Sequence, residues 1–93
     1  MTDGAPISLR GKRALVTGAG QRVGQAIALA LGAEGMHVAV HYRESRAGAE
    51  QTAAKISESG GSAVLLAADL SSREQARGLV DRAVAELGGL DLL

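Results

Sequence analysis

Short runs of aliphatic residues alternate along this chain with longer segments whose apolar residues recur at helical spacing. Residues 13–17 form the first run, and its continuously apolar middle is typical of a strand that is covered on both faces. In the next segment, apolar residues recur every four positions, at Val23, Ile27 and Leu31. Gly35 follows and can end a helix by adopting the left-handed conformation. The pattern predicts a strand that turns directly into a helix.

The same alternation continues beyond this first pair. Residues 37–42 predict a second strand, and residues 47–59 predict a second helix with a thin apolar face. Residues 63–67 predict a third strand. The connections between these segments are short.

A third helix carries a broader apolar stripe and ends at Gly88-Gly89. The stripe consists of Ala76, Leu79, Val80, Ala83, Val84 and Leu87. Ser71 and Ser72 each stand three residues before a Glu or Gln, which is a capping-box pattern. We therefore expect this helix to begin close to these serines.

Strands that alternate with helices predict parallel pairing through helical crossovers, hence a doubly wound α/β sheet of Rossmann type. A fourth strand begins at Leu90 or Asp91, and we expect the sheet to be truncated there. Residues 12–93 would form the N-terminal part of the domain, and residues 1–11, which are polar and mixed, a lead-in.

Composition narrows the class of partner. Ten basic residues balance ten acidic residues, so no strong field attracts nucleic acid or an anionic membrane. The chain has no cysteine and two histidines, which argues against a disulfide framework and against a metal site. It has no apolar run long enough to span a membrane and no signal pattern, so we expect a cytoplasmic protein.

Three glycines follow the first predicted strand, and each has a steric reason. Gly18 permits a tight exit from the strand, Gly20 lets backbone approach a pyrophosphate, and Gly24 lets the helix lie close to the sheet. Because the first turn of a helix has free N–H groups and a positive dipole end, this corner predicts a dinucleotide site. The alternatives are glycines that only permit the turn, or a flavodoxin-like or receiver-type domain that would not need them.

This glycine stretch resembles that of the short-chain dehydrogenase/reductase family. The resemblance extends from about Arg13 to Leu93 and includes Ala68-Asp69-Leu70, which is similar to the acidic turn of the family after strand three. Arg22 departs from the usual glycine or alanine and is similar to the pteridine-reductase branch, as is His41-Tyr42-Arg43.

The resemblance implies that Gly18, Arg22 and Val23 line the phosphates, while Asp69 and Leu70 hold the adenine. Asp69 has an alternative explanation as a turn residue that stabilises the local backbone. The full set of candidate cofactor-binding residues is Gly18, Gly20, Gln21, Arg22, Val23, Gly24, Tyr42, Arg43, Ser45, Asp69 and Leu70.

The end of the second strand determines which cofactor is expected. An acidic residue there would favour NAD, but Tyr42 occupies that place and Arg43 follows. A guanidinium can bind the 2′-phosphate of NADP through two parallel charge-assisted bonds, so we expect NADP rather than NAD. The alternatives are Glu44 as a ribose acceptor, or residues 43–46 as a solvated start of the helix.

No catalytic residue is expected in these 93 residues. Family members use a tyrosine with a lysine four residues on, a serine and an asparagine, whereas Tyr42 is followed at that spacing by Arg46. His37 and His41 flank a buried strand and are expected to be structural.

We therefore expect the cofactor-binding part of an NADP-dependent oxidoreductase that reduces a carbonyl or pterin-like small-molecule substrate by hydride transfer. The complete protein is expected to be a homo-oligomer. The alternative is a non-catalytic nucleotide-binding module or an inactive truncated product.

Overall fold

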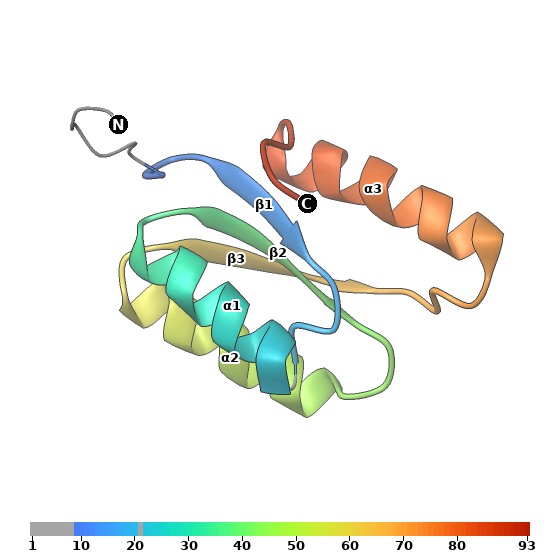
Figure 1. Cartoon of the computed structure of the whole chain (residues 1–93), viewed down its shortest axis with the longest axis horizontal. Coiled ribbons are helices and arrows are strands. Elements are labelled where there is room, and N and C mark those ends of the chain that lie inside the picture. Colours follow the sequence, from blue (N-terminus) through green and yellow to red (C-terminus); the bar gives the residue numbers. More distant parts are fainter. Residues whose placement is uncertain (1–8, 21) are drawn as a thin grey trace.

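Three parallel strands form one sheet with helices on both faces (Figure 1). This computed structural model describes residues 9–20 and 22–93. The predicted strands and helices are confirmed, with small shifts at their ends. In chain order they are β1 (Arg13–Val16), α1 (Arg22–Ala33), β2 (His37–Tyr42), α2 (Arg46–Glu58), β3 (Ser62–Ala67) and α3 (Arg73–Leu87).

The strands lie in the order β1, β2, β3, with Ala14 beside Val38 and Val38 beside Ala63. Beyond α3 the chain returns to β1, where Leu92 forms a parallel bridge with Ala14. Because β2 occupies the other edge of β1, the start of the predicted fourth strand lies on the outer side of β1. This arrangement confirms the doubly wound α/β class.

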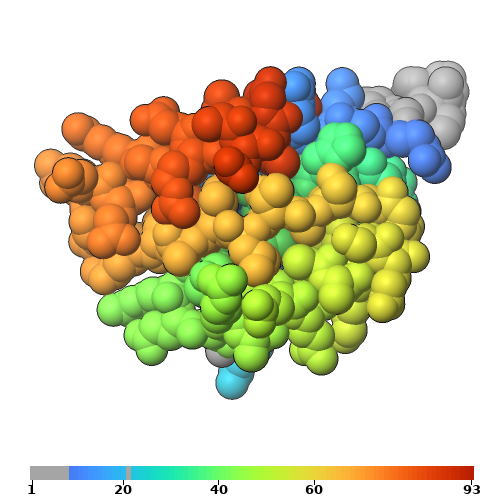
Figure 2. Space-filling model, turned by 180° about the vertical axis from the view of Figure 1, so that it is seen from behind, coloured from blue at the N-terminus to red at the C-terminus, as the bar shows by residue number. Residues whose placement is uncertain are grey.

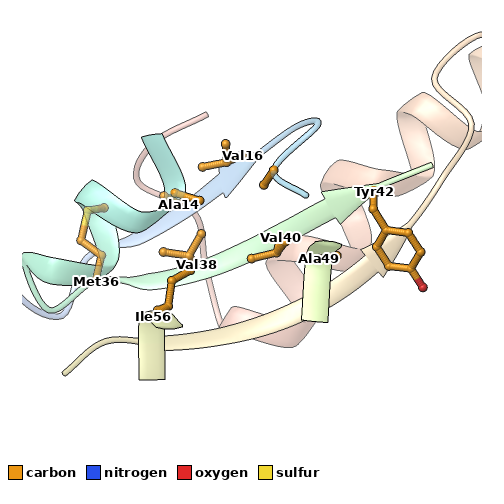
Figure 3. Packing of buried hydrophobic residues seen from close by; sticks show 10 residues of the cluster. Ala14, Val16, Met36, Val38, Val40, Tyr42, Ala49 and Ile56 are labelled. Atoms are coloured by element: carbon orange, nitrogen blue, oxygen red, sulfur yellow. The ribbon is translucent and has the colours of Figure 1, made fainter. Parts of the chain in front are cut away.

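Alternating residues of each strand face two separate apolar clusters, one on each face of the sheet. Ala14, Val16, Val38 and Val40 pack with Ile56 and other residues of α1 and α2 (Figure 3). Leu15, Ala39, Leu66, Leu79 and Ala83 form the cluster under α3. Coverage on both faces explains why the strand sequences are continuously apolar.

The β3 edge of the sheet is visible from behind the molecule, between α2 and α3 (Figure 2). Five of the six residues of β3 are only partly buried or exposed on this edge, and Leu66 is the buried one. Within the predicted apolar stripe of α3, Leu79 and Ala83 are buried, whereas Val84 is 41 % exposed. Within the described ranges, no helix combines the length and apolarity needed to cross a membrane.

The capping box predicted at the start of α3 is only half formed. Ser72 is the N-cap, and its hydroxyl accepts a hydrogen bond from the Gln75 N–H at 3.3 Å. The Gln75 side chain accepts instead from the Asp69 N–H at 2.8 Å, because the Ser72 N–H already donates to the Asp69 carbonyl at 3.1 Å. The glutamine therefore ties the turn after β3 to the helix.

Arg13 fastens the segment after α3 to β1. Its backbone N–H and Nε donate to one carboxylate oxygen of Asp91 at 2.9 and 3.1 Å, and its Nη1 donates to the Gly88 carbonyl at 3.0 Å. These bonds from Arg13 hold the pKa of the Asp91 carboxyl below its ordinary value. Gly88 has φ +80 and ends α3 as predicted.

Two helical glycines provide a matched test of this packing. A Cβ on Gly32 would lie 2.8 Å from side-chain carbons of the fully buried Ile56, whereas a Cβ on Gly78 would have no atom within 4 Å. We expect Gly32→Ala to lower the free energy of unfolding by about 1–3 kcal/mol through overpacking. Gly78→Ala should raise it by about 0.5–1 kcal/mol through helix propensity. Urea unfolding followed by circular dichroism measures both, and effects of the same sign would contradict the α1–α2 contact.

Candidate functional site

Two hollows open at the edge of the sheet where the carboxyl ends of the strands meet. The β2 hollow, of about 410 Å³, lies between the glycine turn (residues 17–20) and residues 41–45. The β3 hollow, of about 340 Å³, lies between the same turn and residues 69–71. Gly18, His41 and Arg43 line both. Open parallel α/β sheets bind ligands at this edge, so the two hollows form the candidate site.

The glycine turn packs backbone against backbone on two sides. A Cβ on Gly24, in the first turn of α1, would collide with the Gly18 carbonyl, so Gly24 allows the close helix approach that the sequence predicts. A Cβ on Gly20 would lie 3.0 Å from the backbone nitrogen of Ala49. Gly20 therefore makes room for the first turn of α2, a reason that the sequence analysis did not include.

Protein groups already bond two amides of the turn itself. The Gly18 N–H donates to Nδ1 of His41 at 3.0 Å, and the Ala19 N–H donates to the His41 carbonyl at 2.9 Å. The hydroxyl of Thr52, which is fully buried, lies 3.0 Å from the Ala19 carbonyl and 2.9 Å from the Gly48 carbonyl, and both can accept its proton. The first turn of α1, where amides lack partners within the helix, therefore offers backbone donors for an anion at this corner that Gly18 and Ala19 do not.

Arg22 begins α1 in a left-handed conformation, with φ +47. Such a conformation costs a non-glycine residue about 1–2 kcal/mol. The side chain is exposed, as is that of Val23, so both lie at the surface where the anion is expected. Gln21, also predicted to bind the cofactor, lies outside the described residues.

Tyr42 lies at the end of β2, where it belongs to the core cluster and also lines the β2 hollow. The residue is 8 % exposed, and its hydroxyl accepts a hydrogen bond from Arg46 at 2.7 Å. Arg46 also pairs with Glu50 at 3.4 Å. The four-residue spacing of Tyr42 and Arg46 thus corresponds to a direct contact that holds α2 against the end of β2.

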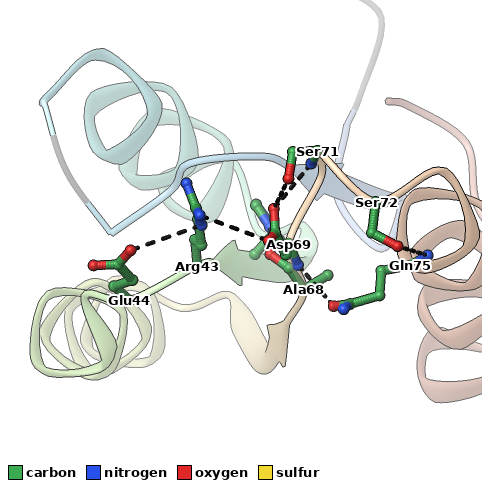
Figure 4. A network of polar contacts seen from close by, with 8 residues as sticks. Arg43, Glu44, Ala68, Asp69, Ser71, Ser72 and Gln75 are labelled. Atoms are coloured by element: carbon green, nitrogen blue, oxygen red, sulfur yellow. Dashed lines mark hydrogen bonds and ion pairs between the residues drawn. The ribbon is translucent and has the colours of Figure 1, made fainter.

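Arg43 projects between two carboxylates and faces both hollows (Figure 4). Its guanidinium lies 3.7 Å from Glu44 and 3.6 Å from Asp69, and its side chain is 61 % exposed. Exposed pairs of this kind contribute little to stability, so a phosphate could replace them at small cost. Ser45 lines the β2 hollow beside Arg43.

Asp69 organises the turn after β3, and Leu70 follows it at the β3 hollow. One carboxylate oxygen of Asp69 accepts from the backbone N–H of Ser71 at 2.9 Å and from its hydroxyl at 2.7 Å (Figure 4). The Ser71 hydroxyl bond, then the Ser71 backbone bond and the charge of Arg43, hold the pKa of Asp69 below its ordinary value. The structure thus contains the turn arrangement that the sequence analysis weighed against adenine binding.

His41 and Thr52 hold the turn but were not among the candidate residues. His41 had been assigned a structural place in β2, and it also lines both hollows. Thr52 lies in α2 on the buried face that includes Ala49 and Ile56. A single polar residue within a buried helical stripe is the signal that could have revealed it.

A third hollow, the aliphatic hollow, lies on the other side of the glycine turn. It measures about 660 Å³ and is lined mainly by aliphatic residues of β1 and α1 together with Leu92 and Leu93. Val23 and Ile27 are 72 % and 48 % exposed there. Apolar surface is therefore open beside β1.

Ser71 gives a test of the turn at Asp69. Because the folded-state pKa of Asp69 is depressed, the turn contributes its full stability above the unfolded-state pKa of about 3.9, and this is lost as pH falls through the folded-state value. Ser71→Ala should raise the pKa of Asp69 towards its ordinary value, while Ser72→Ala should leave it unchanged. Carboxyl ¹³C NMR titration measures this pKa, and an unchanged value in Ser71→Ala would contradict the arrangement.

Comparison with known proteins gives consistent results. The family model described as short chain dehydrogenase matches residues 12–93. An uncharacterised oxidoreductase of Methylorubrum extorquens is 48% identical over 85 residues, which cover 91% of this chain and 34% of that protein.

Two solved structures from Burkholderia cenocepacia are also similar. A short chain dehydrogenase in complex with NADP has a TM-score of 0.86 and 41% identity, covering 92% of this chain and 36% of that one. A second protein, with bound NADP, has a TM-score of 0.87 and 34% identity, covering 95% and 34%. This chain thus spans about a third of the length of these relatives. The chain belongs to the short-chain dehydrogenase family.

Proposed function

We propose that this chain forms the cofactor-binding part of an NADP-dependent oxidoreductase that reduces a carbonyl or pterin-like substrate by hydride transfer. The observation that carries the proposal is Arg43, whose exposed guanidinium faces both hollows beside the glycine turn. Two similar structures contain NADP, which supports this choice of cofactor.

The residues at this edge suit the parts of a dinucleotide. In the proposed arrangement, the first turn of α1 at Arg22 and Val23 binds the pyrophosphate through its amides, which the glycines leave uncovered. Arg43 and Ser45 bind the 2′-phosphate in the β2 hollow. Leu70, 41 % exposed, packs against the adenine in the β3 hollow beside Asp69.

Glu44 supports the competing choice of NAD. Its side chain is 83 % exposed and could accept a bond from a ribose hydroxyl. The carboxylate of Glu44 is one of two that lie near Arg43, and the other belongs to Asp69. The positive charge of Arg43 is therefore shared between the two carboxylates. Arg22 adds a second cation at the phosphate corner, and we therefore favour NADP.

The cofactor supplies the hydride, and residues outside these 93 would supply the proton to the substrate. Tyr42 cannot act as that acid in this arrangement, because its hydroxyl is bonded to Arg46 at the adenosine end of the site. The rival proposal is a nucleotide-binding module without chemistry. The two differ in whether the complete protein oxidises NADPH in the presence of ketones or pterins.

Substitution of Arg43 tests the choice of cofactor. We expect Arg43→Ala in the complete protein to weaken NADP by about tenfold or more, because a charge-assisted bond to the 2′-phosphate is lost. NAD should change by less than about threefold. Isothermal titration calorimetry with both cofactors measures this difference. Arg77→Ala, an exposed charge removal on α3, is the control, and equal losses for NADP and NAD would remove the phosphate site from Arg43.

Substitution of Arg22 separates its charge from its backbone strain. We expect Arg22→Gly to raise the free energy of unfolding by about 1 kcal/mol, because glycine adopts positive φ without strain. Arg22→Ala should show no such gain. Both variants should weaken NADP by a similar factor, since both lose the guanidinium. Urea unfolding and calorimetry measure the two effects, and a loss of affinity in only one variant would contradict the charge assignment.

A further inference from the structure

His41 occupies the junction of the three strand ends. The residue is 4 % exposed, in contrast to Arg43 nearby, and it lines both the β2 and the β3 hollow. Its backbone belongs to β2, and its ring reaches the glycine turn after β1 on one side and the end of β3 on the other. One buried ring therefore connects all three strands at the candidate site.

The partners of the ring define its protonation. Nδ1 faces the Gly18 N–H at 3.0 Å, which can only donate, so Nδ1 must accept. Nε2 faces the Ala68 carbonyl oxygen at 2.9 Å, which can only accept, so Nε2 must carry the proton. The arrangement requires the neutral Nε2–H tautomer. In a doubly protonated ring, Nδ1–H would face the Gly18 N–H.

The bond to Nδ1 acts on the residue from which the chain leaves β1. Gly18 has φ +63, and no neighbouring atom lies within 4 Å of the position of a Cβ, so side-chain packing does not fix this residue. The next two peptides are held by the His41 carbonyl, which accepts from the Ala19 N–H, and by the Thr52 hydroxyl, which lies 3.0 Å from the Ala19 carbonyl. His41 is thus the group that orients the Gly18 amide, ahead of the first turn of α1.

We propose that His41 is a positioning residue for the nucleotide cofactor, acting through the Gly18 amide rather than through its bond to β3. The proposal rests on the proposed function. By holding Gly18, the ring fixes the position of the glycine turn relative to β2. It thereby also fixes the position of the first turn of α1, where the anion binds. It also closes the shared wall of the two hollows without contributing a charge.

Three substitutions distinguish this action from a structural link between β2 and β3. Asparagine places an acceptor near the position of Nδ1, whereas glutamine places a donor near the position of Nε2. Leucine removes both groups while keeping an apolar side chain of similar size. We expect His41→Asn in the complete protein to bind NADP within about threefold of the wild type, and His41→Gln and His41→Leu to bind about tenfold more weakly.

Calorimetry with NADP, paired with urea unfolding of each variant, separates the outcomes. Affinity retained in His41→Gln and lost in His41→Asn would show that the bond to Ala68 matters instead, and equal loss in both would also overturn the proposal. Absence of NADP binding by the wild-type protein would overturn the proposed function itself, which is a different result.

Nitrogen-15 NMR of the ring provides a readout that does not depend on the cofactor. We expect Nε2 to carry the proton, Nδ1 to show the shift of an accepting nitrogen, and the Gly18 amide resonance to move in His41→Leu but to stay closer to wild type in His41→Asn. A ring protonated on Nδ1 at neutral pH would overturn the proposal whether or not NADP binds.

Discussion

The backbone of the glycine turn lies directly against two helices, and this double contact sets the geometry of the candidate site. Gly24 brings α1 onto the turn, while Gly20 and Gly48 bring the first turn of α2 onto it, since a Cβ at any of the three would meet backbone atoms. Where backbones lie this close, their N–H and C=O groups are buried and need hydrogen-bond partners within the protein. His41 and Thr52 provide those partners for the turn on its amide and carbonyl sides.

The same contact links two parts of the site that look separate along the chain. α2 begins at Arg46, directly after the residues that line the β2 hollow. Its contact with Gly20 therefore fixes the loop that presents Arg43 as well as the turn that precedes α1. In the proposed function, the recognition of the 2′-phosphate and of the pyrophosphate would then depend on one packing contact rather than on two independent loops.

The order of elements could be predicted from sequence because each depends on local periodicity and on glycines that end helices, as at Gly35 and Gly88, both with positive φ. Features that depend on packing between elements could not. One neighbour of Gly20 is Ala49, which lies on α2, the second helix after it. The half-formed capping box at Ser72 depended on a competing carbonyl at Asp69, which spacing alone does not reveal.

The sequence predicted best those site residues whose own side chains face the hollows. It predicted least well the residues that only position other residues. Arg43 and Ser45 lie at the β2 hollow, as a charge and a hydroxyl after a strand would suggest. His41 was assigned correctly to a buried strand, but its contact with Gly18 depends on how the glycine turn lies against the end of β2. That placement is a tertiary property, and no spacing within the chain encodes it.

The two sides of the glycine turn differ in chemistry, and Thr17 lies between them, lining both the β3 hollow and the aliphatic hollow. On one side the walls carry Arg43, Asp69 and backbone groups, which suit a phosphorylated nucleoside. On the other side they are mainly aliphatic, and Leu92 brings the end of the chain into the wall. A dinucleotide laid from Arg43 across the first turn of α1 would therefore pass from a polar to an apolar environment. In the proposed function, its phosphorylated half would be recognised by these polar residues, while its other half would lie against the aliphatic walls.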